Sequence, residues 1–150
     1  MAFAKRNLSY LLHPPLLDET GLRAALHWFV EGVKKRSGVE IALLIRPQTF
    51  PRLSGEIETA IFRVVQEALT NVVRHAQSES ARVEIDKQSE AVAVRVRDYG
   101  QGLPADSLEG KKLGVGIAGM RERIRQFGGE LTVTRSEPGT VVEAKIPLFG

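Results

Sequence analysis

The chain has 150 residues, of which 43% are hydrophobic and 26% charged, a composition that suits one globular domain with a proper core and excludes general disorder. It contains no cysteine, which excludes disulfides, thiolate metal sites and cysteine nucleophiles. The net charge of +3 comes from scattered Lys and Arg residues without an aromatic platform for base stacking, so nucleic acid is not an expected partner.

Two helical segments are predicted in the first 38 residues. The first is interrupted at Pro14-Pro15, because proline lacks the N–H that a helix interior needs, and Asp18 or Thr20 can start a new helix. Gly38 is the expected end of the second segment, which covers residues 20–36. Its apolar residues recur at helical spacing: Leu22, Leu26, Phe29, Val30 and Val33.

A strand and a long helix are predicted next. Residues 39–45 form an apolar, β-branched run that ends in a proline-containing loop. Residues 54–76 have helical periodicity, with Ser54 as the candidate N-cap. The apolar arc of this helix consists of Ile61, Val65, Ala68, Leu69, Val72 and Ala76.

The second half of the chain predicts two hairpins separated by a loop and a helix. Alternating runs at 81–86 and 91–98 form the first hairpin, and a glycine-rich loop follows from residue 99 to about 113. A short amphipathic helix covers 116–127, before Gly128-Gly129, and the second hairpin pairs 130–136 with 140–148. The order predicts an α+β two-layer sandwich, a mixed and mostly antiparallel sheet covered on one face by three helices.

Three polar residues share one stripe of the long helix. Glu67, Asn71 and His75 in "EALTNVVRHA" follow one another at four-residue intervals. Each interval advances an α-helix by only about 40°, so all three side chains project from one narrow stripe. This stripe is either a solvated face or the wall of a site.

Asp98 breaks the pattern of the strand that it ends. It follows Val92, Val94 and Val96 on the face that alternation directs toward the helix layer. A carboxylate there needs hydrogen-bond donors. Two interpretations are open: an Asx-type turn that accepts from the backbone N–H of Gly100, or a carboxylate at the rim of a pocket that awaits an N–H donor on a ligand.

Glycines gather in two places after Asp98. In "DYGQGLP", Gly100 and Gly102 permit both a turn and close approach of a ligand to the backbone. In "KKLGVGIAGM" the spacing is G-x-G-x-x-G, but the preceding loop and the flanking hairpins exclude a Rossmann turn. The alternatives are a loop that is merely glycine-rich, or a glycine loop before a helix N-terminus that binds phosphate with help from Lys111 and Lys112.

The set of motifs resembles the GHKL ATP-binding superfamily, which includes sensor histidine kinases, type II topoisomerases, a heat-shock chaperone and mismatch-repair proteins and shares the Bergerat fold. "EALTNVVRHA" is similar to the kinase N box, "DYGQGLP" to the first glycine box and "GVGIAGMRERI" to the second. "GMRERI" and the short interval between the boxes resemble the nitrate and degradative-enzyme sensor kinases. "LLHPPLLDETGLRAAL" is similar to their entry into the catalytic domain.

The resemblance implies roles at the phosphate end of an ATP site. Asn71 would offer its carbonyl oxygen to Mg²⁺, which prefers oxygen ligands. Glu67 would orient or deprotonate the attacking group, or hold a metal-bound water. Arg74 and His75 occupy the positions that the family places near the phosphates and the ribose; the alternative for Arg74, a solvated helix residue, is less favoured.

The resemblance also implies roles at the adenine end and in the lid. Asp98 would accept a hydrogen bond from the exocyclic amine of adenine and reject guanine, which has an oxygen there. Thr140 would support the base through its hydroxyl or a water. The remaining nucleotide contacts implied are Gly100, Gly102, Lys112, Leu113, Gly114, Val115, Gly116 and Ile117, whereas core packing is the better single explanation for Met120.

The phosphoacceptor histidine of such a kinase has no counterpart in the sequence. His13 precedes two prolines and His27 lies among core-like residues, and neither matches the acceptor setting. Residues 1–17 are therefore expected to be the end of a dimerisation helix with its linker, and 18–150 the ATP-binding catalytic domain. The expected partners are ATP, the kinase's own dimerisation domain and, through the full-length kinase, a response regulator.

Location and rival functions complete these expectations. No apolar run approaches the roughly 20 residues that cross a bilayer, so we expect a cytoplasmic domain without direct membrane contact, compatible with a membrane-bound parent protein. Within the superfamily the alternative is an anti-sigma-factor serine kinase. Outside catalysis, the alternative is an interaction module that binds nucleotide weakly or never.

Overall fold

The computed structural model describes residues 15–76, 78–100, 114–136 and 138–148. Its helical elements are α2 (Pro15–Thr20), α3 (Leu22–Ser37), α4 (Gly55–Asn71), the π-helix η1 (Val72–Ala76) and α6 (Gly114–Gln126). Its strands are β1 (Glu40–Arg46), β2 (Ser80–Lys87), β3 (Ala91–Asp98), β4 (Glu130–Arg135) and β5 (Thr140–Pro147). Among these residues no helix has the length and apolarity needed to span a membrane.

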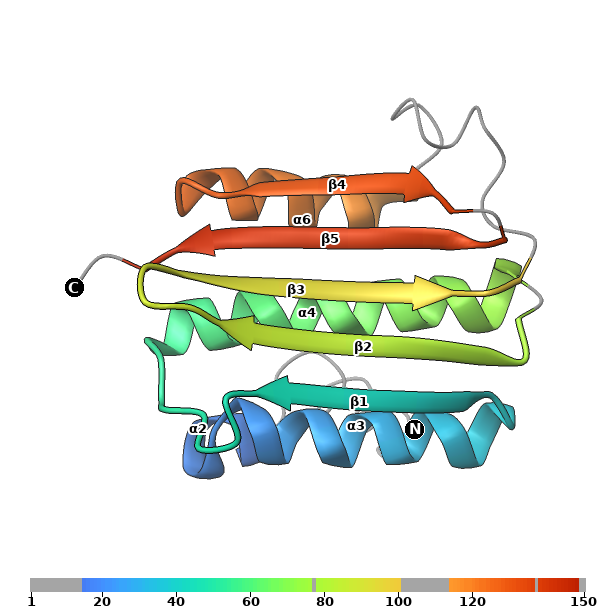
Figure 1. Ribbon diagram of the computed structural model, residues 1–150, viewed down its shortest axis with the longest axis horizontal. Helices are drawn as coiled ribbons and strands as arrows, with labels where there is room; N and C mark the ends of the chain where they lie inside the picture. Colours follow the sequence, from blue (N-terminus) through green and yellow to red (C-terminus); the bar gives the residue numbers. More distant parts are fainter. Residues whose placement is uncertain (1–14, 77, 101–113, 137, 149–150) are drawn as a thin grey trace, which may run out of the picture.

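One five-stranded sheet with the order β1-β2-β3-β5-β4 carries the fold. The predicted hairpins β2–β3 and β4–β5 are confirmed, and β5 also pairs antiparallel with β3. β1 pairs parallel with β2, which makes the sheet mixed. The helices lie behind one face of the sheet, so the predicted α+β two-layer sandwich is confirmed, with the short α2 as an additional helix (Figure 1).

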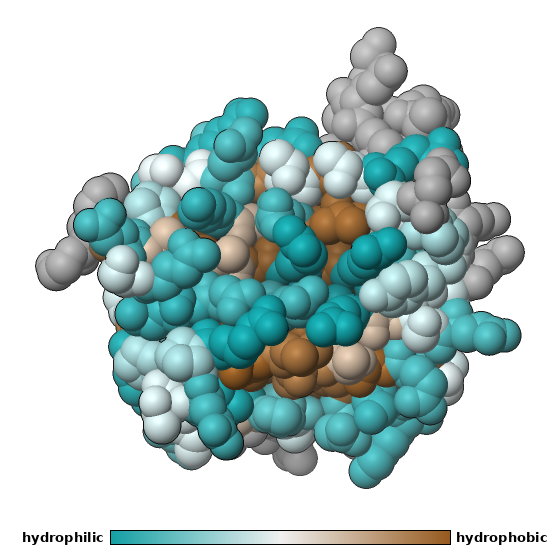
Figure 2. Space-filling view, in the orientation of Figure 1, coloured by the Kyte–Doolittle hydropathy of each residue, from teal (hydrophilic) through white to brown (hydrophobic). Residues whose placement is uncertain are grey.

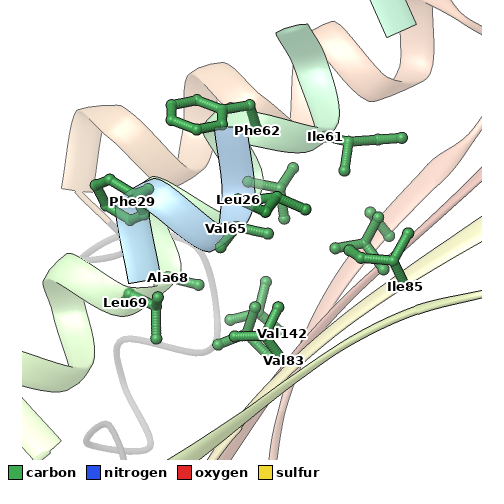
Figure 3. Packing of buried hydrophobic residues seen from close by; sticks show 14 of the residues in the cluster. Leu26, Phe29, Ile61, Phe62, Val65, Ala68, Leu69, Val83, Ile85 and Val142 are labelled. Atoms are coloured by element: carbon green, nitrogen blue, oxygen red, sulfur yellow. The ribbon is translucent and has the colours of Figure 1, made fainter. Parts of the chain in front are cut away.

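The core lies between the helices and the covered face of the sheet. Side chains from α3 and α4, including Leu26, Phe29 and Phe62, lie opposite strand residues such as Val83 and Ile85 (Figure 3). The rings of Phe29 and Phe62 meet edge to face with their centroids 5.4 Å apart. Each buried side chain of this size stabilises the fold by about 1.5–3 kcal/mol, which is why period-2 and period-3.6 patterns predict the layers well.

The predicted start of the long helix and the predicted end of the helix before β1 are confirmed, whereas the predicted start of that earlier helix is wrong. The hydroxyl of Ser54 accepts a hydrogen bond from the N–H of Ile57 at 3.3 Å, and Gly38 ends α3 in the left-handed conformation. Neither Asp18 nor Thr20 is an N-cap, because both belong to the separate helix α2, and α3 begins after Gly21. The local sequence allowed a cap at either residue, but contacts of α2 with the rest of the domain decide the boundary.

The predicted long helix changes type at Asn71. α4 ends there, and Val72–Ala76 continue as a π-helix, in which hydrogen bonds join residues five apart instead of four. The α-helical spacing therefore applies to Glu67 and Asn71 but not to His75. The prediction of one continuous α-helix over 54–76 is therefore wrong, and the shared stripe stays a prediction for His75, of which only the backbone is described.

An ion pair that sequence patterns do not reveal fastens α2 to the start of α4. Glu58 is 1% exposed, and its carboxylate accepts from Nε and Nη2 of Arg52, both at 3.2 Å, and from the N–H of Leu53. Arg52 also donates to the carbonyl of Asp18 at 3.2 Å. The buried side chain of Leu17 thus belongs to the same core as the rest of the domain.

Candidate functional site

A small cavity separates the end of α4 from one end of the sheet. Asn71 lines it from α4, Asp98 from the end of β3, Ile117 from α6 and Thr140 from the start of β5. Its remaining walls are apolar: Ala68, Val72, Val96, Val133 and Val142. Residues far apart in the sequence therefore bring one amide and one carboxylate to the same apolar space.

Asp98 faces this cavity and also makes the Asx-type turn, so the two interpretations of the sequence describe one arrangement. Its side chain is 4% exposed, and Oδ1 accepts from the N–H of Gly100 at 3.0 Å. Burial raises the pKa of the Asp98 carboxyl, while backbone hydrogen bonds from Gly100 and Thr140 and the nearby charge of Arg97 oppose that rise. A buried carboxylate with this environment is typical of a functional site.

Gly139 holds the turn against which Asp98 rests. It has a φ of 97°, and a Cβ placed there would contact the carbonyl oxygen of Asp98 and lie 2.9 Å from its Oδ1. The β4–β5 turn can approach the end of β3 this closely only because residue 139 has no side chain. Gly139 lies between the two predicted strands of the second hairpin, but its contact with Asp98 depends on the tertiary fold.

Glu67 and Asn71 are half-buried polar residues without partners in the described part of the chain. Neither side chain forms a hydrogen bond or ion pair with residues 15–76, 78–100, 114–136 or 138–148. The carboxylate of Glu67 lies directly against the backbone of Gly116 in the first turn of α6, where an added Cβ would collide with its carboxylate atoms. With glycine at position 116, α6 packs against Glu67 without displacing its carboxylate.

A double-mutant cycle tests this contact. Gly116→Ala is expected to be about 0.5–1 kcal/mol less favourable in the presence of Glu67 than in a Glu67→Ala background, because the carboxylate must turn away from the added Cβ. Gly119→Ala is the matched control in the same helix, since no atom lies within 4 Å of its added Cβ. Urea denaturation measures the four free energies of unfolding; absence of coupling between positions 67 and 116 would contradict the contact.

The other predicted site residues divide into three groups. Arg74 lines a separate groove of about 300 Å³ between α3 and α4, together with Phe29 and Val33, and not the cavity with Asp98. Gly114, Val115 and Gly116 lie in the first turn of α6 and not in a loop, so the predicted helix start at 116 is two residues late. Gly102, Lys111, Lys112 and Leu113 lie outside the described residues, and of His75 only the backbone, in η1, is described.

The cavity is too small for a nucleobase in this conformation. Its volume of about 20 Å³ holds roughly one water, whereas ligand pockets commonly exceed 300 Å³. Ile117 is the one lining residue that comes from α6, and α6 is not hydrogen-bonded into the sheet. Entry of a planar ring between α4 and the sheet would require Ile117 to move outward.

The fold and the cavity define an α+β domain with a buried polar site. The carboxylate of Asp98 lies among valines, which suits an apolar ring with an amino group, and Asn71 lines the same cavity. In the described residues no group of three or more His, Cys, Asp or Glu side chains could hold a metal ion.

Comparison with known proteins gives the family. Residues 56–150 match the family described as "Histidine kinase-, DNA gyrase B-, and HSP90-like ATPase", and the chain belongs to this family. It therefore contains an ATP-binding domain. The resemblance predicted from the sequence motifs is confirmed.

Sensor kinases are among the similar proteins. The sensor histidine kinase MctS of Rhizobium johnstonii is 35% identical over 144 residues, which cover 95% of this chain and 31% of that protein. The oxygen sensor histidine kinase NreB of Staphylococcus carnosus is 32% identical over 144 residues, covering 95% of this chain and 41% of its own. The chain thus spans about 31% to 41% of the length of these relatives.

A solved structure shares the fold. The histidine kinase domain of the blue-light activated histidine kinase from Erythrobacter litoralis EL346 superposes with a TM-score of 0.71 at 28% identity. The match covers 92% of this chain and 70% of that one. The predicted Bergerat-type architecture is therefore confirmed at the level of a solved kinase domain.

Proposed function

We propose that this chain is the ATP-binding catalytic domain of a two-component sensor histidine kinase. The observation that carries the proposal is the cavity shared by Asp98 and Asn71, one on the sheet and one on the helix layer. The relatives described above are sensor histidine kinases, so we do not retain the anti-sigma serine kinase or the non-catalytic module.

At the base end, Asp98 accepts a hydrogen bond from the exocyclic amine of adenine. Its carboxylate is already oriented by the backbone N–H groups of Gly100 and Thr140, so little reorganisation is needed on binding. Thr140, which is 4% exposed, adds a hydroxyl beside the carboxylate. Ile117 and the valines of the cavity supply apolar contact for the ring.

At the phosphate end, the side chains of Asn71 and Glu67, which have no partner among the described residues, provide oxygens one helical turn apart. Asn71 would hold Mg²⁺ through its carbonyl oxygen, and the ion would neutralise phosphate charge when bound. Glu67 orients or deprotonates the attacking group, or holds a metal-bound water. His75, Gly102, Lys112, Leu113, Gly114, Val115 and Gly116 complete the proposed nucleotide contacts, and Arg74 reaches the phosphates only if its side chain leaves the groove beside α3.

The proposed phosphoryl acceptor is a histidine on a dimerisation domain outside this chain. Residues 1–17 are the proposed end of that domain and its linker, and 18–150 the catalytic domain. We expect the isolated chain to bind ATP with little turnover, because positioning of the acceptor supplies most of the catalysis in phosphoryl transfer. The response regulator is reached through the full-length kinase.

Calorimetry with ATP, ADP and GTP, each with and without Mg²⁺, tests the proposal. ATP and ADP should bind and GTP should not, and Mg²⁺ should strengthen ATP binding. Asn71→Ala is expected to remove most of that Mg²⁺ enhancement, a loss of about tenfold in ATP affinity at saturating Mg²⁺, while binding without Mg²⁺ stays the same. The exposed Gln48→Ala, on the loop after β1, is the control and should change neither value.

Two outcomes would overturn the proposal. Equal affinity for ATP and GTP would remove the adenine assignment of Asp98. Absence of ATP binding in a folded protein would remove the nucleotide site altogether.

A further inference from the structure

The two edge strands of the sheet, β1 and β4, differ in what lies beside them. At the β1 edge, Nη2 of Arg23 donates to the carbonyls of Ile45 at 3.2 Å and Pro47 at 3.1 Å, and α3 runs along this side of the sheet (Figure 1). At the other edge, β4 pairs only with β5 among the described strands. A side chain thus bonds the end of the β1 edge, whereas no hydrogen bond within the described residues reaches the outward backbone groups of β4, which form a row of donors and acceptors.

β4 also lacks the features that usually protect an edge strand. Its sequence, Glu-Leu-Thr-Val-Thr-Arg, contains no proline, and its pairing with β5 runs in unbroken register from Glu130 to Arg135 without a bulge. The four central residues are uncharged. Three of them, Thr132, Val133 and Thr134, are β-branched, which favours the extended backbone of a strand. An edge of this kind is a template for an additional strand.

An open hollow of about 830 Å³ follows this edge. It is lined by β4 residues from Leu131 to Thr134 and by Arg121 and Arg125 of α6, and it extends past residues 128–130 to Ala91, Lys145 and Pro147 at the adjoining end of the sheet. Neither arginine forms an ion pair or hydrogen bond with the described residues, whereas Glu130 stands opposite Lys145 in the β4–β5 register. The uncompensated charge of the hollow is therefore positive and lies on its helix side.

The spacing of the two arginines matches the spacing of alternate side chains along a β-strand. One helical turn separates Arg121 from Arg125, a rise of about 6 Å, and α6 extends alongside β4 (Figure 1). Alternate residues of a β-strand point to the same side and are about 6.6 Å apart. Acidic side chains at positions i and i+2 of an added strand would thus face both arginines together.

We propose that the outer edge of β4 binds an extended, acidic segment of a partner protein as a sixth strand, with acidic residues at alternate positions directed at Arg121 and Arg125. Backbone hydrogen bonds to β4 supply affinity, and the arginine pair selects the charge and spacing. The open face of the sheet contributes less, because much of it carries hydrophilic side chains (Figure 2) that already form cross-strand pairs such as Arg95–Glu143 at 2.7 Å.

The test uses this chain, labelled with ¹⁵N, and a synthetic ten-residue peptide of alternating Glu and Val, with a Lys and Val peptide as its counterpart. We expect the acidic peptide to bind and to slow amide hydrogen exchange in β4. Arg121→Glu with Arg125→Glu should weaken this binding by about tenfold or more and favour the lysine peptide. Lys34→Glu with Lys35→Glu, on α3, changes the net charge equally and should leave binding within about twofold.

Exchange in β4 separates strand addition from attraction by charge alone. Peptide binding without slower exchange in β4 would overturn the proposal, and so would equal binding of both peptides. Slow β4 exchange without peptide, together with a dimer in sedimentation, would assign the edge to a second copy of the chain and likewise overturn it. These readouts do not involve nucleotide, so their failure is distinct from failure of the ATP-binding proposal.

Discussion

Asp98→Asn is expected to weaken ATP binding by about 30- to 150-fold, which corresponds to about 2–3 kcal/mol for a hydrogen bond to a charged acceptor. The variant keeps one oxygen, which can still accept from the N–H of Gly100, so the turn after β3 should survive. Its amide nitrogen replaces the second oxygen and presents a donor toward the amine of adenine. Calorimetry with ATP measures the loss, and unchanged affinity would refute the role of Asp98.

The same variant has an opposite effect on the stability of the free protein. Because burial raises the pKa of Asp98 above its ordinary value of 3.8, the folded state binds this proton more readily than the unfolded state. Stability contributed by this group therefore falls as pH rises through the interval between the ordinary and the raised pKa. We expect the ATP-free Asp98→Asn variant to be at least as stable as the parent at pH 7, with the difference shrinking as the pH falls through that interval.

Gly139→Ala is expected to destabilise the fold by about 2–4 kcal/mol and to abolish measurable ATP binding. Two costs combine: a φ of 97° that side chains rarely adopt, and a Cβ that contacts the backbone carbonyl of Asp98. Backbone atoms cannot move aside as a flexible side chain can, so the end of β3 must shift and take the carboxylate with it. Urea denaturation and calorimetry measure the two effects.

Gly38→Ala isolates the first of these costs. Gly38 has a φ of 76°, but no atom lies within 4 Å of an added Cβ, so only conformational strain of about 1–2 kcal/mol is expected, without effect on ATP binding. Equal losses of stability in Gly38→Ala and Gly139→Ala would mean that the contact of the added Cβ at position 139 with Asp98 does not contribute to the destabilisation.

Features that depend on neighbouring residues were predictable from the sequence. The cap at Ser54 and the end of α3 at Gly38 are formed within a few residues, and each hairpin joins strands that are adjacent in the chain. Alternation along β3 was enough to direct Asp98 toward the helix layer, because the side-chain period of a strand is 2. Periodicity, however, assumes ideal geometry, and the π-helix after Asn71 breaks that assumption at His75 and Arg74.

The sequence by itself determined the layers, the hairpins and the family. Each was predicted from the hydrophobic periodicity, the turn residues or the order of motifs, which can be read directly from the sequence. Only the tertiary structure decided the parallel pairing of β1 with β2, the clamp between Arg52 and Glu58, and the approach of Gly116 to Glu67 and of Gly139 to Asp98. These contacts join segments that lie far apart in the chain or whose side-chain directions depend on packing. Their geometry depends on how the helices pack against the sheet. That packing is determined by side chains throughout the core, so it cannot be read from any local sequence pattern.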